Sequence, residues 1–186
     1  MEYIAFNPIK AMKSKVIVLA VLLVAASARP TFAVTPAAAK PASRVSVVFV
    51  EPQKFTDLKR DSWGDYSPDL AGQLQAFMQE TGERYVPAGM HLVIKVTDVD
   101  LAGDFEPQLG PSFADVRMVR AVYPPRIKLE FSLTDAKGAV LNSGSREITD
   151  LAFQMRAAWS ADDYLRYEKE ILRDWFSSEF GRVAKN

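Results

Sequence analysis

Residues 126–148 read RIKLEFSLTDAKGAVLNSGSREI, and this stretch decides the fold of the chain. Apolar and polar residues alternate strictly over its first part, where the apolar set is Ile127, Leu129, Phe131 and Leu133. Such alternation predicts a strand with one buried and one solvent-exposed face. The next four residues, Asp135 to Gly138, have the composition of a tight turn and predict a hairpin into a second strand over residues 139–148.

Two helices are predicted, one before and one after this hairpin. The first covers residues 67–81, with Ser67 as its N-cap and Gly82 as its stop signal. The second covers residues 160–180, and its apolar residues spread over an arc wider than one sheet face normally covers. Its start carries a capping box and a hydrophobic staple, formed by Ser160, Asp163, Trp159 and Tyr164.

Three further segments have the composition of strands. Residues 45–50 are apolar on both faces, which is typical of a central strand. Residues 92–97 are a second strand, and a strand, helix and strand of this length favour a parallel right-handed crossover. Residues 116–123 are a candidate for a third. The sequence therefore predicts an α+β domain, a two-layer sandwich in which a mixed four- or five-stranded sheet carries two helices on one face.

The N-terminus has the regions of a secretory signal peptide in the correct order. Two lysines precede an apolar run over residues 16–26, and small residues lead to Ala33. The run has about eleven residues, whereas a membrane-spanning helix needs roughly 20. We therefore predict that residues 1–33 are a cleaved signal peptide, with Met12 as a candidate true start, and that no stable membrane anchor remains after cleavage.

Cleavage at this point leaves a disordered Ala/Pro linker over residues 34–43 and a single α+β domain over residues 44–181. The signal carries four basic residues and one acidic residue, so 19 basic and 22 acidic residues remain and the net charge is −3. This weak negative balance argues against nucleic acid as a partner. Because the chain has no cysteine, it has neither a lipidation site at the end of the signal nor a disulfide framework.

The common catalytic templates do not fit the sequence. His91 is the single histidine, so the His-pair zinc motifs are excluded within one chain. The segment Ser143-Gly144-Ser145 lacks the spacing of a nucleophile elbow, and no phosphate-binding loop is present. We therefore assign no catalytic residue, metal site or cofactor. Hydrolysis by two carboxylates stays open, because the sequence does not single out one pair.

Residues 98–106, DVDLAGDFE, are the most chemically suggestive stretch. Asp98 and Asp100 match the first ligands of a calcium loop, but Leu109 stands where the bidentate Glu belongs. The favoured interpretation is a solvated strand exit whose Asp side chains bind nearby amides. The alternatives are a calcium site and a ligand or partner loop. The residues of that loop would be Asp98, Asp100, Asp104 and Glu106.

Glu168 is a second notable carboxylate, because it falls in the middle of the aromatic arc of the last helix. Burial of an unpaired charge costs several kcal/mol, so an arginine or backbone amides should reach it. Arg126 is the expected partner, in a buried ion pair with a structural role. Arg117 and Arg120 face opposite ways on a regular strand, which weakens the case for an anion site. The tryptophans, expected in the core, are Trp63, Trp159 and Trp175.

A set of short motifs is distributed between residues 44 and 180. The set comprises Glu51-Pro52, Phe55-Thr56-Asp57, Asp98 to Gly103, Pro125-Arg126-Ile127, Tyr167-Glu168-Lys169 and Asp174-Trp175. Together these motifs resemble a family of exported proteobacterial proteins that is known as a domain of unknown function. The resemblance implies a periplasmic location and no activity, substrate or catalytic residue.

Because the strong signals concern export and packing, we expect a non-catalytic periplasmic binding or envelope-assembly accessory module. Its partner would be an envelope protein or a small ligand. The alternative is a small periplasmic hydrolase that uses paired carboxylates, with Asp98, Asp100 and Glu168 as candidates. A hydrolase requires carboxylates that converge in a concave pocket, whereas a binding module requires an exposed apolar patch or a free sheet edge.

Overall fold

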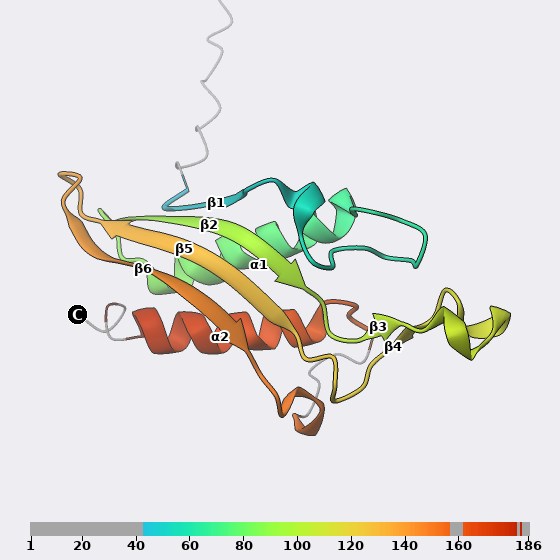
Figure 1. Ribbon diagram of the computed structural model, residues 1–186. Coiled ribbons are helices and arrows are strands. Elements are labelled where there is room, and N and C mark those ends of the chain that lie inside the picture. The colour runs from blue at the N-terminus through green and yellow to red at the C-terminus, as the bar shows by residue number, and fades with distance from the viewer. Residues whose placement is uncertain (1–42, 157–161, 182, 184–186) are drawn as a thin grey trace, which may run out of the picture. The chain divides into compact units, whose positions relative to one another are not determined.

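The computed structural model describes residues 43–156, 162–181 and 183. Within them, a four-stranded sheet has the order β1-β2-β5-β6 (Figure 1). Its strands are β1 (Val45–Phe49), β2 (His91–Asp100), β5 (Arg126–Thr134) and β6 (Val140–Thr149). β1 is parallel to β2, and the other neighbours are antiparallel, so the sheet is mixed as predicted.

Two helices cover one face of this sheet, α1 (Pro68–Tyr85) and α2 (Arg166–Phe180). The inward side chains of β1, β2 and β5 join the apolar sides of both helices in one core. Its most completely buried members include Leu74, Met78, Leu92, Ile94, Leu129 and Phe176. The predicted two-layer α+β architecture is confirmed.

α1 begins at the predicted residue but ends later than predicted. The Ser67 hydroxyl accepts a hydrogen bond from the Leu70 amide at 3.4 Å, as an N-cap should. Gly82 does not stop the helix, which continues to Tyr85. A Cβ at Gly82 would lie 3.0 Å from the Val45 side chain and 3.2 Å from the Phe176 ring. This glycine therefore allows close packing of α1 against β1 and α2.

β1 lies at an edge of the sheet, which corrects the prediction of a central strand for residues 45–50. Val45 and Val47 face the core, whereas Val48 faces solvent. The apolar residues of the outer face are therefore not covered by another layer. The Gln75 side chain donates a hydrogen bond to the Val47 carbonyl at 2.8 Å, so α1 also holds this strand.

The predicted hairpin is present, with Gly138 at a φ of 84° between β5 and β6. The inner face of β6 is more polar than that of the other strands, although Ile148 packs against the core. Asn142 and Arg146 both bind the Glu179 carboxylate of α2, at 3.0 Å and 2.9 Å. Gly144 lies opposite Phe131, and a Cβ there would come within 2.7 Å of the Arg146 guanidinium, so this glycine leaves room for the Arg146 side chain.

A second, two-stranded sheet was not predicted. It pairs β3 (Asp104–Phe105) with β4 (Arg117–Met118). Between them run two 3-10 turns, η2 (Pro107–Leu109) and η3 (Pro111–Phe113). Together, residues 104–118 form an arm that projects beyond the four-stranded sheet (Figure 1). The predicted strand over residues 116–123 is wrong apart from β4, because the chain turns at Ala121 and Val122.

The last helix starts later than predicted, at Arg166 instead of residue 160. Ser160 and Trp159, from the predicted capping box and staple, lie outside the described residues, as do residues 1–33 and 34–42. Asp163 accepts a hydrogen bond from the Leu165 amide at 3.0 Å just before the helix. Two short 3-10 turns complete the fold, η1 (Pro52–Lys54) and η4 (Phe153–Met155). In the described part of the chain, none of the helices has the length and apolar character needed to cross a membrane.

Candidate ligand-binding pocket

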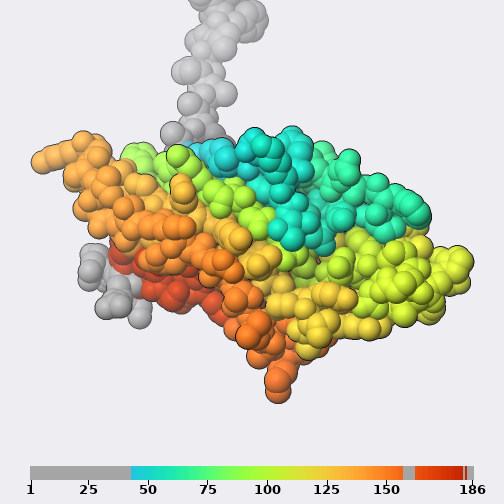
Figure 2. All heavy atoms as spheres, viewed as in Figure 1, coloured from blue at the N-terminus to red at the C-terminus, as the bar shows by residue number. Residues whose placement is uncertain are grey.

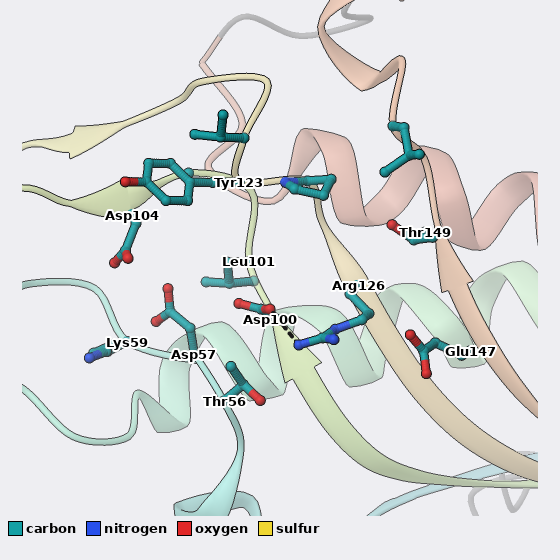
Figure 3. Close-up of a pocket in the computed structure, with 14 residues that line it drawn as sticks. Thr56, Asp57, Lys59, Asp100, Leu101, Asp104, Tyr123, Arg126, Glu147 and Thr149 are labelled. Atoms are coloured by element: carbon teal, nitrogen blue, oxygen red, sulfur yellow. Dashed lines mark hydrogen bonds and ion pairs between the residues drawn. The ribbon is translucent and has the colours of Figure 1, made fainter.

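A pocket of about 580 Å³ lies where β2 ends and the chain enters the arm (Figure 3). It is lined by the segment Thr56 to Lys59, the exit of β2, the start of β5 and the end of β6. The charged residues of its lining are Asp57, Lys59, Asp100, Asp104, Arg126 and Glu147. An isolated parallel bridge between Asp57 and Asp100 places the segment after β1 beside the end of β2, at this pocket.

The two aspartates at the end of β2 have different environments. Asp98 accepts hydrogen bonds from the Thr56 amide at 2.8 Å and the Thr56 hydroxyl at 2.9 Å, so it fixes the neighbouring segment. Asp100 faces the pocket and pairs with Arg126 at 2.9 Å. Burial raises the pKa of the Asp100 carboxyl, and Arg126 opposes that rise only in part. Within residues 98–106, Asp98 therefore acts as an anchor and Asp100 as a pocket residue.

The other two acidic residues of this stretch are also separated by the fold. Asp104 lines the pocket, and its carboxylate accepts a hydrogen bond from the Phe105 amide at 2.7 Å. Glu106 is buried and binds Arg120 at 3.1 Å and the Tyr123 hydroxyl at 3.1 Å. Each of the four acidic residues in this stretch therefore has its own partners. The four are Asp98, Asp100, Asp104 and Glu106. Among the described residues, no three acidic or histidine side chains gather as a metal ion would require.

A buried ion pair lies at one wall of the pocket, where Asp57 belongs to the lining and its partner Arg117 does not. Sequence analysis missed this pair. Arg117 donates two hydrogen bonds to the Asp57 carboxylate, at 2.6 Å and 3.1 Å. It also binds the carbonyls of Gly103 and Lys59, at 2.8 Å and 3.1 Å, and the Tyr164 hydroxyl at 2.8 Å. One guanidinium therefore joins the arm, the segment after β1 and the entry to α2.

The arginines near this pocket do not form an anion site, because each has its own carboxylate. Arg117 binds Asp57, Arg120 binds Glu106 and Arg126 binds Asp100. Three charged residues of the pocket lining make no ion pair with any described residue. They are Lys59, Asp104 and Glu147. Figure 3 shows Lys59 and Asp104 on one side of the pocket and Glu147 on the other.

The predicted ion pair between Glu168 and Arg126 is wrong, although Glu168 is buried as predicted. One carboxylate oxygen of Glu168 accepts a hydrogen bond from the Ala102 amide at 2.7 Å. The other oxygen has no hydrogen-bond partner among the described residues. Burial raises the pKa of Glu168 to about 7, and the hydrogen bond from Ala102 only partly opposes this rise. Glu168 therefore links α2 to the segment that follows β2.

This raised pKa predicts a pH-dependent stability that Glu168→Gln should remove. Because the folded state binds the proton more tightly, the free energy of unfolding falls as the pH rises from about 4.5 to about 7. The expected loss is about 3 kcal/mol, from the rule of 1.4 kcal/mol per pKa unit. Urea unfolding at pH 5 and pH 8 measures it, with the exposed Glu130→Gln as control. Equal pH dependence of the wild type and Glu168→Gln would contradict the prediction.

The chain matches the model of one protein family over residues 43–178. That family is described as Protein of unknown function (DUF3016), and the chain belongs to it. The resemblance to a domain of unknown function is therefore confirmed. No curated protein matches the chain.

A solved structure described as a minor lipoprotein from Acinetobacter baumannii is similar at 13% identity. The alignment covers 76% of this chain and 92% of the lipoprotein chain, with a TM-score of 0.25. A similarity at that level supports no inference about this chain.

Proposed function

We propose that the chain is an exported, non-catalytic binding module of the periplasm and that the pocket at the end of β2 is its ligand site. The predicted signal peptide supports export. The observation that carries the binding function is a set of three charges that pair with no described residue, Lys59, Asp104 and Glu147, in a lining whose other charges are paired. A small polar ligand with both an amino and a carboxyl group complements one cation and two carboxylates.

A carboxylate-dependent hydrolase is the second candidate function, and fewer observations support it than support the binding module. Such an enzyme needs two carboxylates that face one reacting atom, one of them with a raised pKa. Glu168 has a raised pKa, but its carboxylate is buried against the Ala102 amide. Burial also raises the pKa of Asp100, which reaches the pocket, yet its carboxylate is held in an ion pair with Arg126. Asp98 binds Thr56 instead.

Thermal unfolding of the mature chain with a panel of amino acids and short peptides tests the binding function. A ligand that binds the folded state raises the melting temperature. A free ligand concentration of about 100 times the Kd adds about 2.7 kcal/mol to the free energy of unfolding. Lys59→Met, Asp104→Asn and Glu147→Gln should each weaken binding about tenfold, a factor worth about 1.4 kcal/mol. Glu130→Gln, on the exposed part of β5, is the matched control.

Three outcomes count against this proposal. No panel member binds, binding is unchanged in all three pocket variants, or the chain hydrolyses a panel peptide and Asp100→Asn abolishes that hydrolysis. The last outcome would establish the enzyme instead.

A further inference from the structure

The tip of the arm is uncharged and exposes large apolar side chains. Residues 107–114, PQLGPSFA, contain no charged residue. Leu109, Phe113 and Val116 are each about 45% exposed, although residues of this size are usually covered in a soluble domain. Figure 2 shows the arm as a convex projection and not as a groove. A convex tip of this kind is suited to a binding surface that deforms around it.

The backbone of the tip satisfies most of its own hydrogen-bond donors. The two 3-10 turns pair the amides of Leu109, Gly110 and Phe113 with carbonyls three residues earlier in the arm, at 3.0 to 3.2 Å. Pro107 and Pro111 have no amide hydrogen. Since unsatisfied backbone groups make transfer into lipid costly, a tip built in this way can leave water at a reduced cost.

An exposed tryptophan lies at the same end of the domain. Trp63 was expected in the core, but 81% of its surface is exposed. The Ser62 hydroxyl donates a hydrogen bond to the Asp115 carboxylate at 2.7 Å, which ties the loop of Trp63 to the arm. Tryptophan is enriched at membrane interfaces, where its ring meets acyl chains and its N–H meets water. Its exposure adds a fourth large apolar side chain at this end of the domain.

We propose that this tip, formed by Trp63, Leu109, Phe113 and Val116, inserts reversibly into the interface of a phospholipid bilayer. Asp61 and Asp65 flank Trp63 in the sequence and Asp115 precedes Val116, so these carboxylates repel anionic headgroups and the tip fits a zwitterionic surface. The convex shape of the arm, the uncharged sequence of residues 107–114 and their internally bonded backbone favour lipid over a protein groove. This inference is independent of the pocket, which lies at the base of the arm.

Co-flotation of the full mature chain with vesicles tests the proposal. Vesicles of phosphatidylcholine are compared with vesicles in which a quarter of the lipid is phosphatidylglycerol. We expect the chain to bind the phosphatidylcholine vesicles, and salt should not weaken this binding. Binding to the vesicles that contain phosphatidylglycerol should be weaker. Trp63→Ser and Phe113→Ser should each lower the partition coefficient about tenfold, as loss of a buried aromatic contact does. Met155→Ser is the control, because Met155 is more exposed than any tip residue and lies in η4, where Gln154 binds the Val119 carbonyl just after the arm.

Several results would overturn the proposal. The first is an absence of binding to both kinds of vesicle, which would leave a protein partner as the occupant of the tip. The second is binding that Met155→Ser weakens as much as the tip variants do. The third is binding confined to anionic vesicles and abolished by salt, which would indicate a basic patch elsewhere. Circular dichroism of each variant confirms that lost binding does not reflect unfolding.

Discussion

Arg117→Met should lower the free energy of unfolding by about 3 to 5 kcal/mol, the cost of leaving one member of a buried ion pair without its partner. Arg117 and Asp57 are both 8% exposed at their side chains. Burial alone would lower the pKa of the Arg117 guanidinium, yet Asp57 holds that pKa above its ordinary value. Methionine fills much of the same space but leaves the Asp57 carboxylate uncompensated.

Urea unfolding of three variants separates this effect from a general loss of surface charge. Arg84→Met removes an exposed pair with Glu80 and should cost less than about 1 kcal/mol. Adding Asp57→Asn to Arg117→Met should restore part of the lost stability, because the uncompensated charge disappears. A loss below about 1 kcal/mol in Arg117→Met would mean that the pair is solvated and does not hold the pocket wall.

The sequence predicted those elements of the fold whose signals are local. The alternation over residues 126–134, the turn ending at Gly138 and the Ser67 cap each depend on a few adjacent residues. The position of a strand within a sheet depends on its neighbours, so an apolar run on both faces of residues 45–50 did not reveal an edge strand. Gly82 shows the same limit, because a helix stop and a close packing contact both select glycine.

The candidate site was predictable only in part. The polar exit of β2 indicated Asp100 and Asp104, and both line the pocket. The pair of Asp57 and Arg117 joins residues 60 positions apart, and no local pattern marks them as partners. The partner of Glu168 is a backbone amide. Every residue except proline carries such an amide, so side-chain composition could not identify it.

Trp175→Ala should lower the free energy of unfolding by about 3 to 5 kcal/mol, as truncation of a buried tryptophan does. Trp175 lies between both layers, with ring centroids 5.8 Å from Phe131 and 5.5 Å from Phe180. It also packs at 4.7 Å against Phe176, a neighbour on its own helix. Alanine would leave a cavity bordered by these three rings, which the sheet and α2 can close only in part.

Trp175→Phe separates lost packing from a lost hydrogen bond. The indole nitrogen of Trp175 is buried and has no hydrogen-bond partner among the described residues. Phenylalanine keeps an aromatic ring in place and removes that unsatisfied donor, so the loss should stay below about 1.5 kcal/mol. Equal losses in both variants, measured by urea unfolding, would show that the indole N–H is bonded in solution. A loss below about 1 kcal/mol in Trp175→Ala would instead place this face of α2 outside the core, because a buried tryptophan costs more to remove.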